Sequence, residues 1–307
     1  MLEVRDLKYS YSNNSDFQLN VPEWSCAAGS RLAIVGRSGS GKTTFLKLLA
    51  GLLQPDGGEI TWKDEKVKGA KERLVPGNDT IKLVRQDFGQ DPHLSVVENL
   101  RKYILSHEDE ERAKRIEKWL EELSLEELGQ RKALQLSGGQ LQRVALAQTL
   151  LAEPEVLLMD EPFSNLDPIH KHEFIPSLRV LFEKEKTTTI SVLHDPVDAL
   201  RFADEIVVFK DGSIIESGPA EELFHQPNTL ETARLFGVVN ILSEEENRAL
   251  LDGKLEKPLV EGKLWFRPDE VKLSDLKVPY EKERSLPVAS GKWIEIRVDQ
   301  RLLIVSE

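Results

Sequence analysis

Residues 36–43, GRSGSGKT, fit the phosphate-binding loop pattern G-x-x-x-x-G-K-[ST]. An apolar run at residues 32–35 predicts a buried strand before it, and residues 43–50 predict a helix after it. Glycines let backbone amides turn inward around phosphate oxygens, and the helix directs its N-terminal dipole at the same anion. The sequence therefore predicts a nucleotide-phosphate site. The expected contact residues are Gly36, Arg37, Ser38, Gly39, Ser40, Gly41, Lys42, Thr43 and Thr44.

Two adjacent carboxylates follow a second apolar run, at residues 156–159, and predict the part of this site that handles metal and water. Lys42 is expected to reach the β- and γ-phosphates, and the Thr43 hydroxyl is expected to bind Mg²⁺. Asp160 is placed to hold Mg²⁺ through water, and Glu161 to polarise the attacking water. An Asp-Glu-Pro sequence is also an ordinary strand-ending turn, so the catalytic interpretation depends on the phosphate loop upstream.

The segment LSGGQ at residues 136–140 predicts a second phosphate contact. Ser137 is the N-cap of a helix that runs to about residue 151, and two glycines leave the amide end of this helix bare. The segment resembles the signature sequence of ABC ATPases, and on this motif the chain is identified as a member of that family. The resemblance implies that Ser137, Gly138, Gly139 and Gln140 contact nucleotide.

Other positions match the family one by one. Gln86 resembles the glutamine that contacts Mg²⁺ and senses the transporter, and His194 resembles the histidine that contacts the γ-phosphate. Asp167 lies in a segment that resembles the loop crossing to the partner subunit, although an Asp-Pro pair is also simply an N-cap before a first-turn proline. Tyr11 resembles the aromatic residue that stacks on adenine, with its neighbour Tyr9 as the alternative.

The resemblance implies an α/β fold: a P-loop NTPase cassette of the ABC type, with a mostly parallel sheet, helices and a helical subdomain. Alternating apolar strands and helices in the sequence independently favour a parallel sheet. The cassette is expected to cover residues 1–237, with the helical subdomain at about 91–152. Residues 238–307 change to short strand candidates between Pro, Gly and charged stretches. They predict a small β-rich C-terminal domain with a single oligonucleotide-fold-like lobe.

Three further segments, at residues 194–200, 218–224 and 267–271, look like importer ATPases of the maltose, polyamine, sulfate and ferric-ion type. Two positions depart from that pattern. The Gln-Asp pair at residues 90–91 stands where this subfamily usually has an apolar pair, in a segment that touches the membrane subunit in relatives. Pro176 falls inside an expected helix and predicts that the helix kinks or shortens there.

The composition and charge of the 307 residues restrict the class of protein. Hydrophobic residues make up 40% and charged residues 31%, which is typical of a globular chain. A formal net charge of −12 argues against a non-specific nucleic-acid binder. Cys26 is a single cysteine, so it forms no internal disulfide. The charged first residues, without an apolar run of about 18, predict a cytoplasmic protein, peripheral on the inner face of the cell membrane.

The resemblance implies an ATP-binding and ATP-hydrolysing subunit of an ABC importer, with ATP and Mg²⁺ as cofactors. One phosphate loop and one signature segment per chain imply a homodimer, in which each ATP lies between Lys42 of one chain and Ser137 of the other. Transmembrane permease subunits and, indirectly, a solute-binding protein are the expected partners, and no nucleic acid is expected. Two alternatives stay open: a non-transport cassette ATPase acting on nucleic acid or the ribosome, and a P-loop small-molecule kinase.

Overall fold

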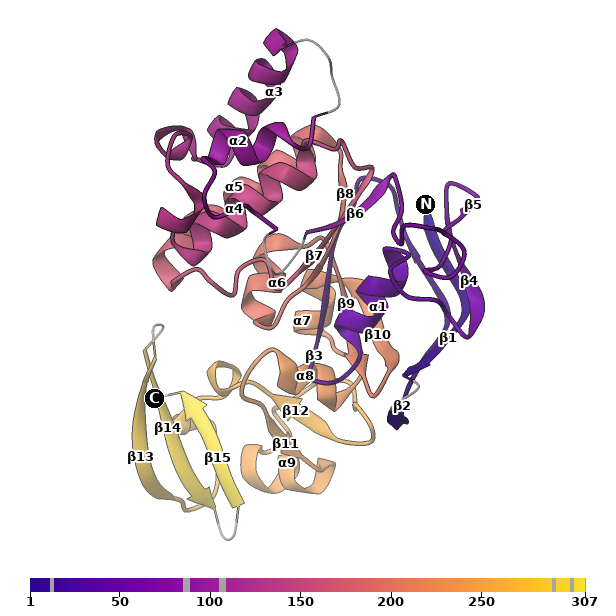
Figure 1. The fold of residues 1–307 in the computed structure, drawn as a ribbon. Helices are drawn as coiled ribbons and strands as arrows, with labels where there is room; N and C mark the ends of the chain where they lie inside the picture. Colours follow the sequence, from indigo (N-terminus) through magenta and orange to yellow (C-terminus); the bar gives the residue numbers. More distant parts are fainter. Residues whose placement is uncertain (12–13, 85–88, 105–108, 289–290, 299–300, 307) are drawn as a thin grey trace. The chain divides into compact units, whose positions relative to one another are not determined.

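The apolar runs of the sequence form the strands of a six-stranded sheet in a computed structural model, which describes residues 1–306 apart from 12–13, 85–88, 105–108, 289–290 and 299–300 (Figure 1). The strand order is β10-β9-β3-β8-β7-β6, and every neighbouring pair is parallel except β9 with β10. The strands are β3 (Arg31–Gly36), β6 (Ile81–Val84), β7 (Val156–Asp160), β8 (Thr188–Val192), β9 (Glu205–Lys210) and β10 (Ser213–Pro219). Strands β3, β7 and β8 are buried along nearly their whole length, as expected for a parallel sheet that is covered on both faces.

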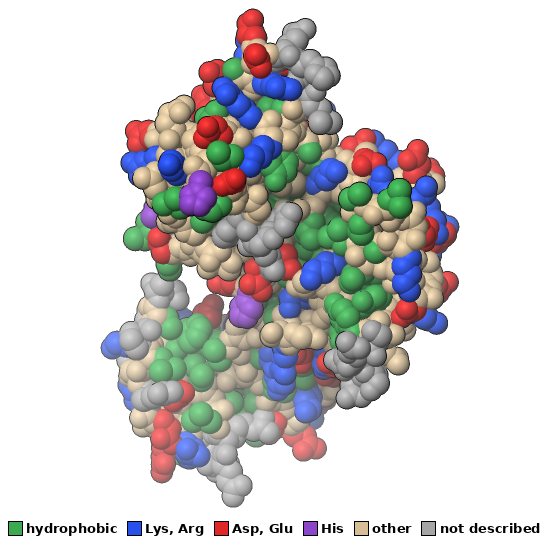
Figure 2. All heavy atoms as spheres, viewed as in Figure 1, with side chains coloured by type: hydrophobic (Ala, Val, Ile, Leu, Met, Phe, Trp, Pro, Cys, Tyr) green, Lys and Arg blue, Asp and Glu red, His purple; other side chains and the backbone are tan. Residues whose placement is uncertain are grey.

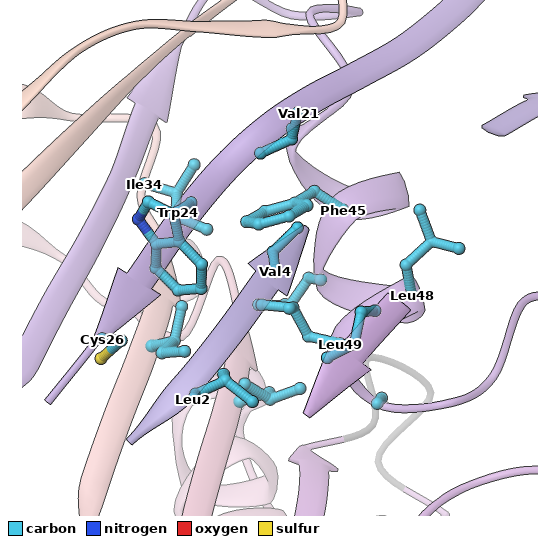
Figure 3. Close-up of a cluster of buried hydrophobic side chains, with 14 of the residues drawn as sticks. Leu2, Val4, Val21, Trp24, Cys26, Ile34, Phe45, Leu48 and Leu49 are labelled. Atoms are coloured by element: carbon cyan, nitrogen blue, oxygen red, sulfur yellow. The ribbon is translucent and has the colours of Figure 1, made fainter. Parts of the chain in front are cut away.

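An antiparallel sheet of order β2-β1-β4-β5 lies in the same unit of the molecule, residues 1–220. Its strands are β1 (Leu2–Tyr11), β2 (Asn14–Cys26), β4 (Gly57–Trp62) and β5 (Glu65–Lys66). Helix α1 (Lys42–Leu49) joins the two sheets, since the Phe45 ring lies 5.4 Å from Trp24 on β2 and 5.2 Å from Phe209 on β9. Figure 3 shows Phe45 and Trp24 within this buried cluster. The core therefore fixes the helix whose N-terminus carries the phosphate loop.

The described residues between β6 and β7 are largely helical, in line with the helical subdomain that the resemblance implies. It contains α2 (Val96–Arg101), α3 (Asp109–Glu122) and α4 (Gly138–Leu150). After β7 come α5 (Pro168–Glu185) and α6 (Pro196–Phe202). Helix α5 continues past Pro176 to Glu185, so Pro176 does not shorten the helix, and the alternative of a kink at Pro176 stays a prediction. Within the described residues, no helix combines the length and apolar character that crossing a bilayer requires.

Residues 221–307 form a second unit, in which the predicted small β-rich domain is present. Its elements are α7 (Ala220–His225), α8 (Leu230–Leu235), β11 (Asn240–Leu242), α9 (Glu244–Leu251), β12 (Leu264–Phe266), β13 (Glu281–Val288), β14 (Gly291–Val298) and β15 (Arg301–Ser306). Strand β11 pairs with β12, and β13, β14 and β15 form an antiparallel sheet. The units divide at residue 220, while the predicted cassette boundary at 237 and the oligonucleotide-fold-like lobe remain predictions.

Candidate active site

The loop between β3 and α1 adopts conformations that only glycine takes easily. Gly36 has φ +148°, and a Cβ there would lie 2.2 Å from the carbonyl oxygen of Phe209. Gly41, which precedes α1, has φ +103°, and its Cβ would meet the Phe17 ring at 2.9 Å. Both glycines are thus required by close approach of neighbouring atoms. The loop therefore presents backbone amides and the start of α1 to an anion.

Lys42 lies folded onto this loop. Its Nζ donates to the carbonyl oxygens of Gly36 and Arg37, at 2.9 Å each. Burial lowers the pKa of Lys42, and the nearby carboxylates of Glu161 and Asp160 oppose that shift. The Ser40 hydroxyl is buried with no hydrogen-bond partner among the described residues. A phosphate group would offer anionic oxygens to the Lys42 ammonium and a hydrogen-bond acceptor to the Ser40 hydroxyl. The loop therefore fits a nucleotide.

A hydroxyl and a carboxylate come together beside the loop. The Thr43 hydroxyl donates to the Asp160 carboxylate at 3.2 Å, which joins the first turn of α1 to the end of β7. Burial raises the pKa of Asp160, although the hydrogen bond from Thr43 lowers it. Oxygen donors of these two types are the ligands that Mg²⁺ prefers in proteins. The pair therefore fits a magnesium site, while the predicted third ligand, Gln86, lies outside the described residues.

Glu161 follows Asp160 in an uncommon backbone conformation. Its φ is +51°, a left-handed value that few non-glycine residues adopt. Four hydrogen bonds to described residues hold it there. Its N–H donates to the carbonyl of Val192 at 2.9 Å. Its own carbonyl accepts from Ser164 N–H at 3.2 Å, Ser164 Oγ at 3.0 Å and Gln142 Nε2 at 3.1 Å. Backbone strain that the surroundings maintain is typical of functional sites.

The predicted catalytic residues come from adjacent strands at one edge of the sheet. Strand β8 lies between β3 and β7, and all three run in parallel. Lys42 follows β3, Glu161 follows β7, and His194 lies two residues beyond the end of β8, where it is exposed. Ligands of open α/β sheets bind outside the carboxyl ends of the strands. The structure therefore brings these three sequence-predicted residues to the edge where a bound nucleotide is expected.

The aromatic candidate for adenine stacking also reaches α1. The Tyr11 hydroxyl and the Thr44 hydroxyl form a hydrogen bond of 3.0 Å, and 38% of Tyr11 is exposed. Tyr9 packs edge-on against Tyr11, with ring centroids 5.0 Å apart, and is less exposed. Tyr11 is therefore the more accessible of the two rings and the one whose hydroxyl is hydrogen-bonded to Thr44 in the first turn of α1.

The signature segment opens α4 as the sequence predicts. Ser137 Oγ accepts from the Gln140 N–H at 3.3 Å, and Gln140 Oε1 accepts from the Ser137 N–H at 3.0 Å, a complete capping box. Ser137 and Gly138 are exposed. Gly139 also has a packing reason, because its Cβ would lie 2.6 Å from Leu166 Cδ2. The exposed start of α4 therefore offers amide groups to another molecule.

Asp167 is the N-cap of α5. One carboxylate oxygen accepts from the N–H groups of Ile169 and His170, at 3.0 and 3.1 Å. Hydrogen bonds from His170, chiefly from its side chain, lower the pKa of this carboxyl. Asp167 is exposed, so it has a structural role and remains accessible to a partner chain.

The Gln-Asp pair at residues 90–91 is part of the contact between this segment and α4. Gln90 Nε2 donates to the carbonyl of Leu141 and to Gln148 Oε1, at 3.2 Å each. Asp91 exchanges two backbone hydrogen bonds with the Asn99 side chain, at 2.8 and 3.0 Å. Both residues of the pair therefore make hydrogen bonds within the protein.

Sequence reasoning did not identify Gln142 as part of the site, and it placed Ser164 only in the segment 164–167 that resembles the loop crossing to the partner subunit. Both hold the backbone of Glu161, and neither belongs to the five-residue signature segment. The contact of Gln142 joins residues 19 positions apart, so no local pattern indicates it, whereas Ser164 lies three positions after Glu161, at the spacing of an ordinary turn.

Comparisons with known proteins agree on one family. A family model described as ABC transporter matches residues 19–164. The spermidine/putrescine import ATP-binding protein PotA of Mannheimia succiniciproducens is 32% identical over all of this chain and 88% of its own length. The sulfate/thiosulfate import ATP-binding protein CysA of Synechococcus elongatus is 36% identical over 82% of this chain and 72% of its own. The Fe(3+) ions import ATP-binding protein FbpC of Pseudomonas fluorescens is 35% identical over 83% and 73%.

Solved structures give the same result. A dimeric ATP-binding cassette in a post-hydrolysis state, bound to ADP and phosphate, superposes with a TM-score of 0.61 at 30% identity, covering 72% of this chain and 99% of the cassette. The cbiO1 protein of Clostridium perfringens, part of an ABC transporter complex, superposes with a TM-score of 0.65 at 28% identity, covering 73% of this chain and 90% of its own.

Proposed function

The chain belongs to the ATP-binding subunits of ABC transporters, and from that premise we propose which of its residues bind and hydrolyse ATP, and for which partners. It is an ATPase of the ABC type, and its curated relatives are importer subunits. The observation that carries the residue assignment is the convergence of Lys42, Glu161 and His194 at the carboxyl edge of β3, β7 and β8.

Each residue has one task in hydrolysis. Lys42 exchanges its carbonyl partners for oxygens of the β- and γ-phosphates, and the loop amides hold the remaining oxygens. Glu161 orients the attacking water and takes its proton as the water oxygen bonds to the γ-phosphorus and the bond to ADP breaks. His194 hydrogen-bonds the γ-phosphate. Thr43 and Asp160 would hold Mg²⁺, which supplies charge neutralisation on the phosphates.

Two copies are proposed to share each nucleotide. The exposed start of α4 at Ser137 would close on the γ-phosphate bound by the partner chain, and Asp167 would lie at the same seam. The dimeric state of the cassette with ADP and phosphate supports this arrangement for the present chain. ATP would close the dimer and hydrolysis would reopen it.

Separate permease subunits are the proposed partners that this cycle drives, with a solute-binding protein supplying the permease. The protein would then lie in the cytoplasm, peripheral on the inner face of the membrane. Its relatives are named for importing polyamines, sulfate and Fe(3+), which supports import. The nucleic-acid alternative is not favoured: Figure 2 shows Lys and Arg interspersed with Asp and Glu over the described residues of the face drawn there, with no large basic area on it.

The Glu161→Gln variant tests the residue assignment. Removing a general base slows the chemical step by roughly 10²–10⁴-fold, while the amide keeps the shape of the side chain. We expect MgATP to bind with unchanged affinity, hydrolysis to fall by at least about a hundredfold, and ATP but not ADP to produce a dimer on sizing. Asp269→Asn, a conservative change at an exposed carboxyl of the second unit, is the matched control. Wild-type turnover in Glu161→Gln would refute the assignment.

A second measurement tests the transport role. The protein is co-purified with its candidate permease in lipid nanodiscs, and ATP turnover is measured with and without polyamines, sulfate and Fe(3+). Stimulation by one solute class supports import of that class. An ATPase that binds no permease and responds instead to nucleic acid or ribosomes would favour the alternative function.

A further inference from the structure

One face of α4 contacts the segment that contains the catalytic loop. Gly139 and Arg143 lie one turn apart on this face. Gly139 approaches Leu166 so closely that a Cβ would stand 2.6 Å from its Cδ2. The Arg143 guanidinium lies over the Phe174 ring, 4.7 Å from its centroid. The helix that begins at the signature segment is therefore packed against residues 161–174 along its first turns.

Gln142 lies on the same face and, within the part of the chain that the structure describes, makes the side-chain hydrogen bond that joins α4 to Glu161. Its Nε2 donates to the Glu161 carbonyl at 3.1 Å, while its Oε1 is buried without a partner among the described residues. Because a carbonyl oxygen can only accept a hydrogen bond, the Gln142 side chain must turn its NH₂ group, and not its oxygen, toward the Glu161 carbonyl. Leaving a buried oxygen without a hydrogen bond is unfavourable, so the contact with Glu161 outweighs that cost here.

The hydrogen bond from Gln142 acts on Glu161, whose backbone conformation is one that non-glycine residues seldom adopt by themselves. Glu161 has φ +51°, and its carbonyl must stay in place for the carboxylate to keep its direction. Ser164 Oγ, which also donates to this carbonyl, belongs to the same loop and moves with it. Gln142 is different because it belongs to a helix whose first residues are proposed to grip the partner chain's nucleotide.

We propose that Gln142 is a positioning residue that ties the signature helix to the general base of its own chain. The inference rests on the proposed function. When the start of α4 engages the nucleotide of the partner chain, the helix moves as a rigid element, and Gln142 carries that displacement to the Glu161 carbonyl. The base is aligned only when α4 is seated. Each site of the dimer therefore prepares the other for hydrolysis.

The Gln142→Met variant removes the donor and keeps the length of the side chain. Loss of one hydrogen bond at an aligned group predicts a fall in kcat of about 5- to 30-fold, with Kd for ATP unchanged within about twofold. The Hill coefficient for ATP hydrolysis should fall toward 1. Gln142→Leu, which also lacks the donor and adds no charge, gives the same result if the methionine variant folds poorly. Gln130→Met is the matched control. Gln130 is exposed in the segment between α3 and α4, so this variant should hydrolyse ATP like the wild type.

A double-mutant cycle separates positioning from a merely structural role. If Gln142 acts through the Glu161 carboxylate, then adding Gln142→Met to Glu161→Gln should slow residual single-turnover hydrolysis by less than about twofold. Equal slowing in both backgrounds would overturn the proposal, as would wild-type turnover and cooperativity in both Gln142 variants. If instead Glu161→Gln itself turns over normally, the proposed function fails and this inference fails with it. A fast Gln142→Met beside a slow Glu161→Gln overturns only the positioning role.

Discussion

Replacing Tyr11 by alanine should remove the platform on which adenine stacks. The ring is 38% exposed, and its hydroxyl is 3.0 Å from Thr44 Oγ1, so the ring stands beside the first turn of α1. Stacking of a base on an aromatic ring contributes about 1–3 kcal/mol. The variant should therefore bind ATP about 5- to 150-fold more weakly. Tyr11→Phe keeps the ring and loses only the bond to Thr44, so its Kd should change by less than about fivefold.

Calorimetric titration of MgATP into proteins that also carry Glu161→Gln measures these affinities without hydrolysis. Titration with tripolyphosphate is the internal control, because it fills the phosphate loop and has no base to stack. Tyr11→Ala should leave that affinity unchanged within about twofold while weakening ATP. Tyr9→Ala serves as the neighbouring control. A loss of ATP affinity in Tyr9→Ala and not in Tyr11→Ala would refute the assignment, and equal losses for ATP and tripolyphosphate would show that the loop itself was damaged.

A substitution at the start of α4, truncation of the second unit and labelling of Cys26 test three other features of the structure. Ser137→Arg places bulk and charge at the start of α4, so the ATP-dependent dimer should be lost on sizing while ATP binding by the monomer remains. Truncation after residue 220 should leave ATP binding and hydrolysis in place; truncation after residue 239 should add aggregation, seen by light scattering, because α8 then loses its contact with Trp265. Burial raises the pKa of Cys26 to about 11, so below that pH the thiol stays protonated, and a thiol reagent at pH 8 should label the protein only after denaturant unfolds it.

Features that depend on residues close together in the chain could be predicted from the amino-acid sequence. The phosphate loop needs glycines at fixed spacing, a strand before it and a helix after it, and all three are contiguous at residues 32–50. The apolar run at residues 156–159, which forms most of β7, indicates a buried strand of a parallel sheet. The capping box at Ser137 likewise closes within four residues.

Some features needed the folded chain, among them the continuation of α5 past Pro176. Pro176 removes one backbone donor from α5, yet the helix continues to Glu185, because packing of Phe174, Leu178 and other buried side chains outweighs the local preference. The oligonucleotide-fold-like lobe and the exact role of each site residue remain predictions.

The way in which the loop at Glu161 is held follows from contacts between distant segments of the folded chain. The positive φ of Glu161 depends on hydrogen bonds to β8 and to α4, whose partner atoms lie 31 and 19 residues away in sequence. The sequence indicates only that Gly139 leaves the first amide groups of α4 uncovered. The structure shows in addition that Leu166 leaves no space for a side chain at this position. Such contacts join segments far apart in the chain. Their geometry follows from how the helix and the sheet pack together, which no local pattern of residues specifies.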